Sequence, residues 1–231
     1  MKRSLYLYIN LRDNSFRNKY MEEKVDTLTP PKFVKSGVVK PRSKAFKDGN
    51  WLGTFNLWIV QDKPTPTILY QLRNPKLSFF PNKLDVSVGG HYLAGEDQKG
   101  GLREVKEELN RTYDFGKLSF LGRRMFVSPD LKKVMRHYIV DVFMVLDNSL
   151  LESYKLQKDE VYAIFFLPID KLIKVHTVKN CTFKAKGIKN NGKNIEVTVK
   201  KGSFPYNFDD YHHKIALLAR RFLKKEKNLI Y

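Results

Sequence analysis

Residues 89–109 read GGHYLAGEDQKGGLREVKEEL and combine two glycine pairs with a carboxylate-rich run. The end of this stretch favours a helix, on which Glu104, Glu107 and Glu108 share one face because they are three and four positions apart. Like charges at this spacing repel each other, so the arrangement costs stability unless a partner neutralises it. Mg²⁺ is a suitable partner, because it binds carboxylate oxygens, water and substrate phosphate oxygens. A solvated acidic face on a surface helix is the alternative.

The glycines favour the metal-site interpretation. Gly89 and Gly90 follow the apolar segment Leu84–Val88, which predicts a strand. We therefore expect a tight turn at this glycine pair, where the backbone is able to approach a ligand closely. Gly95 predicts a second turn before the helix. A strand, a glycine-rich loop and an acidic helix together predict a cradle for a phosphate group and a metal ion, and this chemistry needs no nucleophilic side chain.

The same stretch resembles the Nudix box, whose pattern is Gly, five residues, Glu, seven residues, Arg-Glu, an aliphatic residue, any residue, Glu-Glu, any residue, Gly and an aliphatic residue. The box positions are filled here by Gly90, Glu96, Arg103, Glu104, Val105, Glu107 and Glu108. Only six residues separate the first glutamate from the arginine, and Asn110 and Arg111 replace the last glycine and aliphatic residue. Asn is the next-best residue for the left-handed cap that Gly serves. None of these departures touches a metal-binding carboxylate.

The resemblance implies an α/β Nudix fold, in which a mixed β-sheet is sandwiched between helices (α/β/α). It also implies hydrolysis of a nucleoside diphosphate linked to another moiety, with Mg²⁺ as cofactor and Mn²⁺ as a substitute. Glu104, Glu107 and Glu108, together with the Gly90 carbonyl, are then expected to hold the metal. Arg103 is expected to orient a neighbouring carboxylate, a task that suits a planar guanidinium.

Further candidates flank the box. Glu160 lies where the resemblance implies an extra metal ligand or general base, and the alternative is a turn residue that faces water. Arg73 and Lys76 are candidates for binding a substrate phosphate, each with a solvated loop cation as the alternative. His91 is expected either to bond a backbone carbonyl or to position a phosphate or a metal-bound water. We place Glu96 with the substrate-binding residues.

A narrower resemblance, which runs roughly from Met21 to Leu223, links the chain to Nudix proteins related to isopentenyl-diphosphate isomerase. That isomerase uses a catalytic cysteine and a metal held by histidines and glutamates. Here Gly89 stands in the place of the cysteine, and Phe46 and Leu52 stand where upstream histidines are expected. Only His91 remains of the set. We therefore expect kinship with the isomerase without isomerase activity.

Composition bounds the class of protein. A length of 231 residues suits one domain with decorations. The single cysteine, Cys181, excludes an intramolecular disulfide and a Cys-rich zinc site, and it suits a reducing cytoplasm. The apolar run near the N-terminus is too short for a secretory signal. No stretch approaches the length of a membrane span, so no membrane partner is expected.

The formal net charge of +19 arises from 43 Lys and Arg against 24 Asp and Glu. Such a charge attracts polyanions, which leaves nucleic acid, a phosphate-rich small molecule and a compositional bias without function as open interpretations. The alternative function is therefore an RNA-directed Nudix protein that removes a cap or 5′ diphosphate or binds RNA. No stacking motif with interleaved aromatic residues is visible. A homodimer is also left open.

We expect an N-terminal extension over residues 1–32 and a Nudix domain over 33–231, with the box at 90–111. Extended structure is expected from Phe33 to Val60. Period-two patterns and apolar runs predict strands at Thr54–Val60, Ile68–Leu72, Leu118–Val127, Tyr138–Leu146 and Val161–Phe166. An Asn-Gly pair between extended arms predicts a basic hairpin insertion at about 182–203. Residues 209–225 predict an amphipathic C-terminal helix.

Overall fold

The computed structural model describes residues 22–129, 134–205 and 209–231. Residues 1–21 of the expected N-terminal extension therefore lie outside the described part of the chain. The strands are β1 (Lys24–Thr29), β2 (Val34–Pro41), β3 (Trp51–Gln61), β4 (Thr67–Arg73), β5 (Leu84–Asp85), β6 (Val88–His91), β7 (Ser119–Pro129), β8 (Met135–Leu146), β9 (Val161–Pro168), β10 (Phe183–Lys189) and β11 (Asn194–Val199). The helices are α2 (Arg42–Lys47), α3 (Leu102–Leu109), α4 (Ile169–Thr177) and α5 (Tyr211–Leu223), with 3₁₀ turns η1 (Phe115–Lys117), η2 (Leu151–Ser153) and η3 (Lys201–Ser203).

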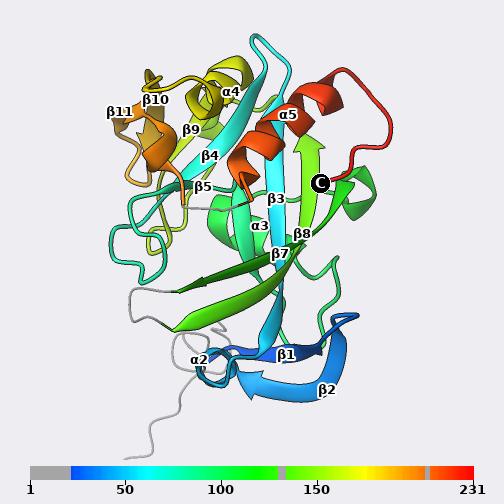
Figure 1. Cartoon of the computed structure of the whole chain (residues 1–231). Helices are drawn as coiled ribbons and strands as arrows, with labels where there is room; N and C mark the ends of the chain where they lie inside the picture. Colours follow the sequence, from blue (N-terminus) through cyan, green and yellow to red (C-terminus); the bar gives the residue numbers. More distant parts are fainter. Residues whose placement is uncertain (1–21, 130–133, 206–208) are drawn as a thin grey trace, which may run out of the picture.

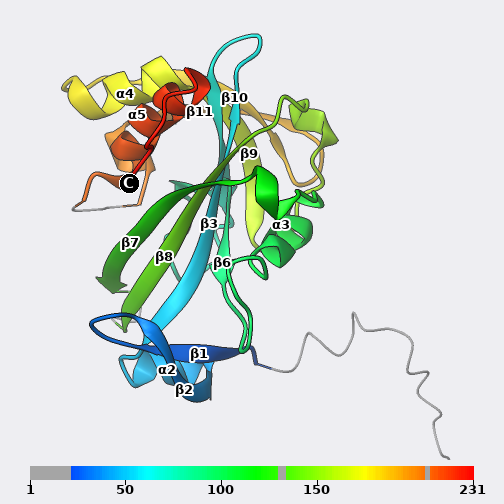
Figure 2. The same ribbon diagram turned by 90° about the vertical axis from the view of Figure 1, so that its right-hand side faces the viewer.

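The described strands form one mixed sheet whose main path runs β11-β10-β9-β4-β3-β1-β2 (Figure 1). Helix α3 covers one face of this sheet, and α4 and α5 lie together on the other (Figure 2). Strand β3 is apolar at every residue from Leu57 to Val60, because both of its faces are covered there. Phe55, Leu57 and Ile59 pack in the same core as Val105 and Leu109 of α3. Trp58 and Val60 pack in the opposite core with residues of α5. The expected α/β/α sandwich is therefore confirmed.

Strands β3 and β4 are paired only near their hairpin. Their register covers Val60↔Ile68 and Gln61↔Thr67. Farther from the hairpin, β3 pairs with β6 on one side and runs parallel to β8 on the other. Over the same length β4 pairs with β9 and β5 instead. The two central strands therefore separate, and the backbone leaves an opening between them.

The predicted strands in the middle of the chain are confirmed with small shifts at their ends. The Asn-Gly hairpin is also confirmed, because β10 and β11 pair in antiparallel register and β11 forms one edge of the sheet. The C-terminal helix is confirmed as α5, and its Ile215 side chain is fully buried. Three predictions are wrong. Leu84–Val88 does not form one strand, because Val86 and Ser87 lie between β5 and β6. Arg42–Lys47 forms the helix α2 where extended structure was expected, and Gly89 and Gly90 lie inside β6 instead of in a turn.

The described part of the expected N-terminal extension belongs to the hydrogen-bonded sheet. Strand β1 pairs with β2 and, at Thr27↔Leu52 and Leu28↔Trp51, with β3. A domain boundary near residue 32 stays a prediction. Among the described helices, none is long and apolar enough to cross a membrane.

Candidate active site

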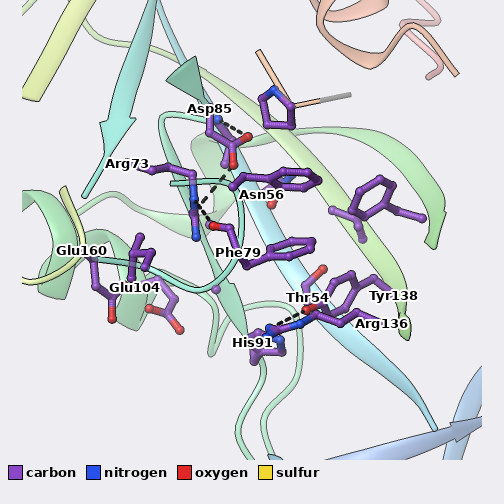
Figure 3. A pocket seen from close by; sticks show the side chains of 18 of the residues that line it. Thr54, Asn56, Arg73, Phe79, Asp85, His91, Glu104, Arg136, Tyr138 and Glu160 are labelled. Atoms are coloured by element: carbon purple, nitrogen blue, oxygen red, sulfur yellow. Dashed lines mark hydrogen bonds and ion pairs between the residues drawn. The ribbon is translucent and has the colours of Figure 1, made fainter. Parts of the chain in front are cut away.

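A cleft of about 260 Å³ opens where β3 and β4 separate. Its floor consists of alternate residues of the neighbouring strands, which point to one face because side chains alternate along a strand. These residues are Thr54 and Asn56 of β3, Arg124 and Phe126 of β7, and Arg136, Tyr138 and Val140 of β8. Glu104 and Glu107 of α3 and Glu160, which precedes β9, form the acidic side. Figure 3 shows Glu104 and Glu160 across the cleft from Arg136 and Tyr138.

The glycine pair of β6 explains how an acidic helix on one face of the sheet reaches this cleft. A Cβ atom on Gly90 would lie 2.0 Å from Cδ of Glu104. A Cβ atom on Gly89 would lie 2.9 Å from Oδ1 of Asn56. Both glycines pair with β3 in regular antiparallel register. Glycine is therefore required at both positions by the close approach of a side chain to the backbone, of Glu104 at Gly90 and of Asn56 and Val86 at Gly89, and not by a turn.

The carboxylates of α3 differ in exposure but affect one another. Glu104 is 9% exposed and Glu108 is 2% exposed, whereas Glu107 is exposed. Burial raises the pKa of Glu104 to about 7, and the charges of Glu107 and Glu160 add to the rise while Arg103 opposes it. Burial also raises the pKa of Glu108 well above its usual range, with Glu104 and Glu160 contributing. The pKa of Glu160 is raised by desolvation at the cleft wall. Glu104, Glu108 and Glu160 therefore lie near one another, and the nearby arginines oppose the rise in their pKa values only in part.

Arg103 holds three carboxylates at once. Its Nη2 donates to Oε1 of Glu104 at 3.0 Å and its Nη1 to Oε2 of Glu107 at 2.8 Å. Its Nε donates to Oε1 of Glu96 at 3.2 Å, and Nη2 also donates to the His91 carbonyl at 3.1 Å. The second oxygen of Glu96 accepts from the backbone N–H of Leu93 at 2.8 Å. Glu96 therefore anchors the arginine and does not line the cleft, so the structure does not place it with substrate-binding groups.

Cationic and aromatic groups form the other side of the cleft. Arg73 lines it, donates from Nε to the Phe79 carbonyl at 3.1 Å and has Nη1 3.7 Å from Oδ2 of Asp85 (Figure 3). The guanidinium carbon of Arg136 lies 4.8 Å from the ring centroid of Phe79. Lys76 is exposed and does not line the cleft, so only one of the two predicted phosphate-binding cations lies there.

His91 lines the cleft with a ring that is buried among aromatic neighbours. Its ring centroid lies 5.6 Å from that of Phe46 and 5.4 Å from that of Tyr138. Within the described part of the chain, its buried Nε2 has no hydrogen-bond partner. Burial lowers the pKa of His91 well below its usual range, and the charges of Arg42 and Arg136 contribute. The imidazole is therefore neutral at pH 7.

Sequence inspection missed Arg42, Asn56, Phe79 and the role of Arg136 as a lining group. One signal was present in β8, where an arginine and a tyrosine two residues apart precede an apolar run and share a face. The other residues carried no such signal, because they enter the cleft from a short helix, a central strand and a loop that only the fold brings together.

The donor set fits a hard divalent cation by its chemistry, since such ions prefer carboxylate oxygens. Among the described residues, no group of three or more His, Cys, Asp or Glu side chains is arranged so that it holds a metal ion as it stands. Arg103 engages Glu104 and Glu107 where a cation would otherwise neutralise them. The side chain of Glu107 is 51% exposed, so it has room to rotate away from the arginine.

Comparisons with known proteins agree with this geometry. No protein-family model matches the chain. The chain is 30% identical over 137 residues to the protein named Uncharacterized Nudix hydrolase CA_C0446 of Clostridium acetobutylicum, a match that covers 58% of this chain and 65% of that protein. It is 32% identical over 155 residues to Nudix hydrolase 3 of Arabidopsis thaliana, which covers 65% of this chain and 20% of that protein. The chain belongs to the Nudix superfamily. The relation to isopentenyl-diphosphate isomerase within this superfamily stays a prediction.

A solved structure is similar in fold to this Nudix chain. The crystal structure of DR0079 from Deinococcus radiodurans superimposes with a TM-score of 0.50 and 21% identity, covering 69% of this chain and 91% of that one. The Nudix chain spans 65% and 20% of the lengths of its two curated relatives, so their activity is carried over to it only as a proposal. The comparisons give no support to the nucleic-acid partner or the homodimer that the sequence left open.

Proposed function

We propose that this Nudix chain is a Mg²⁺-dependent pyrophosphohydrolase that cleaves the diphosphate linkage of a nucleoside diphosphate joined to another moiety. The observation that carries the proposal is the division of one cleft into an acidic side and a cationic side. Glu104 and Glu160, carboxylates with raised pKa values, lie on the first side together with Glu107, and the buried Glu108 belongs to the same helix as Glu104. Arg73 and Arg136 lie on the second. A diphosphate bridged to divalent metal ions requires both kinds of group.

Glu104, Glu107 and Glu108 are the groups that would hold the metal, with the Gly90 carbonyl as a further oxygen ligand. Mn²⁺ is expected to substitute for Mg²⁺, because both are hard cations that accept carboxylate ligands. When bound, the metal would neutralise the diphosphate and lower the pKa of an attacking water. Arg103 supports this set by fixing the direction of Glu104 through a hydrogen bond of 3.0 Å.

The remaining side chains bind and orient the substrate. Arg73 is held by the Phe79 carbonyl, so its guanidinium is positioned at the cleft before a phosphate arrives. Neutral His91 presents an unpartnered Nε2 that suits a phosphate oxygen or a water molecule. Glu160 is the candidate general base, because its raised pKa brings it closer to neutral pH, where a base works best. Positioning and charge stabilisation are expected to supply most of the rate.

A substrate panel tests the proposal. The full chain is incubated with nucleotide sugars, dinucleoside polyphosphates, oxidised nucleotides and capped RNA, in Mg²⁺, in Mn²⁺ and in excess EDTA. We expect metal-dependent release of a nucleoside monophosphate or phosphate product from at least one small molecule, and no turnover in EDTA. If capped RNA is the one compound of the panel that is hydrolysed, the RNA-directed alternative is supported in place of this proposal. Turnover that is unchanged by EDTA would contradict the proposal.

A further inference from the structure

One ion pair that lines the cleft has no role in the proposed function. It joins Arg42, the first residue of α2, to Glu23, which precedes β1. Nη1 of Arg42 donates to Oε2 of Glu23 at 2.5 Å. Both residues line the same cleft as Glu104, Glu107 and Glu160 of the acidic side. The cleft therefore contains a further cation, whose partner is a carboxylate.

The backbone of Arg42 is fixed at the wall of the cleft. Its N–H donates to the Glu23 carbonyl at 2.9 Å. Phe46, one turn later in α2, is buried, and its ring lies 5.6 Å from that of His91 and 5.9 Å from that of Tyr138. Because His91 and Tyr138 line the cleft, α2 packs directly against the cleft wall. The position of the Arg42 backbone therefore does not depend on the ion pair that its side chain forms.

The side chain of Arg42 is able to change its partner. It is 40% exposed, and the side chain of Glu23 is 42% exposed. An ion pair this exposed contributes little to stability, because water screens it. A phosphate group is a stronger partner, since the planar guanidinium donates two parallel hydrogen bonds to it. Replacing Glu23 by a phosphate group therefore breaks a weak interaction and forms a stronger one.

The charge of Arg42 acts on groups inside the cleft. Burial lowers the pKa of His91, and Arg42 contributes more to this shift than any other charge. Burial raises the pKa of Glu160, and the charges of Arg73 and Arg42 oppose that rise. A phosphate group that contacts Arg73 beside Glu160 would therefore also lie within the electrostatic range of Arg42.

We propose that Arg42 is a substrate-binding residue, which exchanges Glu23 for a phosphate group of the substrate. This inference rests on the proposed function, because it requires that a diphosphate enters the cleft. Arg42 joins Arg73 in holding the phosphate groups. Glu23 keeps the guanidinium at the cleft when no substrate is bound, so Glu23 competes with the substrate for Arg42.

Binding of α,β-methylene-ADP tests the exchange, because a carbon atom replaces the bridging oxygen of its diphosphate and prevents hydrolysis there. Isothermal titration calorimetry on the full chain, in Mg²⁺ and again in EDTA, measures the affinity. We expect Arg42→Met to weaken binding about tenfold or more, since it removes a hydrogen bond between charged groups. Glu23→Gln is expected to strengthen binding about threefold, since it removes the weak competitor for Arg42.

Lys44→Met is the matched control. It removes a cation from an exposed residue of the same helix, and this residue does not line the cleft. We expect the affinity to stay within about twofold, because salt screens an exposed charge.

A double variant separates exchange from simple repulsion of the ligand by Glu23. When Arg42→Met is already present, Glu23→Gln is expected to leave the affinity unaltered, because no guanidinium remains to be released. If Glu23→Gln strengthens binding equally with and without Arg42, Glu23 acts only by repelling the ligand and the exchange is overturned.

A purely structural ion pair gives a different result. If the pair only holds α2 next to β1, Arg42→Met and Glu23→Gln would both weaken binding and would both lower the midpoint of thermal unfolding. That outcome would overturn the exchange. Unaltered affinity in Arg42→Met, or no saturable binding to the unaltered chain in either solution, would overturn it as well.

The substrate panel tests the proposed function separately. Opposite effects of the two substitutions on binding, without hydrolysis of any compound in the panel, would retain the exchange and refute the hydrolase. Hydrolysis in the panel, with Arg42→Met and Glu23→Gln altering binding in the same direction, would refute the exchange alone.

Discussion

At the scale of single residues, the candidate site depends on Gly90, which leaves space for a glutamate side chain, and on Arg103, which holds the glutamates of α3 in place. Gly90 allows Glu104 to pass over the backbone of β6, since a Cβ atom there would lie 2.0 Å from the carboxylate carbon. Arg103 then holds Glu104 and Glu107 near each other in spite of their like charges. The pattern of carboxylates is visible in the sequence, but the contact that makes Gly90 necessary is not.

We predict that Glu108→Gln lowers kcat by at least about 10²-fold, as is typical when one strong electrostatic group at a reaction centre is removed. The substitution keeps the shape of a side chain that is 2% exposed while it removes the charge that would hold a metal. Steady-state kinetics on a substrate verified in the panel measure the effect. Glu152→Gln, an exposed glutamate of η2, is the control. A Glu108→Gln variant with unaltered turnover would remove the metal role.

Gly90→Ala is expected to displace Glu104, because the new methyl group would lie within 2.5 Å of three atoms of that side chain. We predict a loss of activity similar to that of a missing carboxylate and a lower free energy of unfolding, by about 1–3 kcal/mol as for other overpacked sites. Kinetics and urea unfolding measure the two effects. Gly116→Ala is the matched control, since its Cβ atom would meet nothing closer than 3.6 Å. Equal behaviour of the two variants would contradict the prediction.

At the scale of elements, α3 shows how local sequence fixes the end of the helix that carries the site. Its last residue is followed by Asn110, whose φ of 52° and ψ of 39° place it in the left-handed region. The backbone N–H of Asn110 donates to the Lys106 carbonyl at 3.1 Å, which closes the final turn. The departure of the box from its terminal glycine is therefore compatible with the same cap.

The cap leads to a prediction about stability. Asn110→Gly should keep or raise the free energy of unfolding, whereas Asn110→Ala should lower it relative to the glycine variant by about 1 kcal/mol, because a Cβ atom is unfavourable at positive φ. Asn110 is exposed, so packing does not obscure the comparison. Chemical denaturation of both variants measures the difference. Equal stabilities would indicate that the left-handed cap is not maintained in solution.

At the scale of the whole molecule, buried histidines couple folding to pH. Burial lowers the pKa of His212 well below its usual range and, helped by the charges of His213 and Lys201, lowers that of His176 to about 4. In the unfolded chain a histidine titrates near pH 6.5. The unfolded state therefore binds more protons as the pH falls below about 6.5, and the stabilising contribution present above that pH is lost.

We predict that acid destabilises His212→Phe less than it destabilises the unaltered chain between pH 7 and 4. The raised pKa values of Glu104, Glu108 and Glu160 act in the opposite direction, but they are common to both proteins and cancel in the comparison. One proton bound only in the unfolded state accounts for up to about 1.4 kcal/mol per pH unit. Urea unfolding at several pH values, in EDTA so that no metal contributes, measures both slopes. An unaltered slope in His212→Phe would show that this imidazole titrates normally in the folded protein.

Much of this architecture was determined by local sequence. The apolar runs of β3 and β8, the Asn-Gly hairpin of β10 and β11, the amphipathic pattern of α5 and the cap of α3 all act within a few residues, so their physical causes can be read in the chain. The carboxylate spacing of α3 likewise requires only the helix period. These patterns predicted the strands, the hairpin, the C-terminal helix and the acidic face of α3, whereas the sandwich was predicted from the resemblance to the Nudix box.

Arg73 was a candidate from the sequence, but the place of Arg136 in the cleft, the contact of Gly90 with Glu104 and a second cavity were decided by tertiary structure alone. The parallel pairing of β3 with β8 places Thr54 opposite Val140, and only the separation of β3 from β4 opens the cleft between them. His212 lies far from Lys83 and Phe80 in the sequence, yet all three line one cavity. Local sequence patterns do not predict which of these residues lie together, because strand pairing and packing between residues distant along the chain bring them to one place.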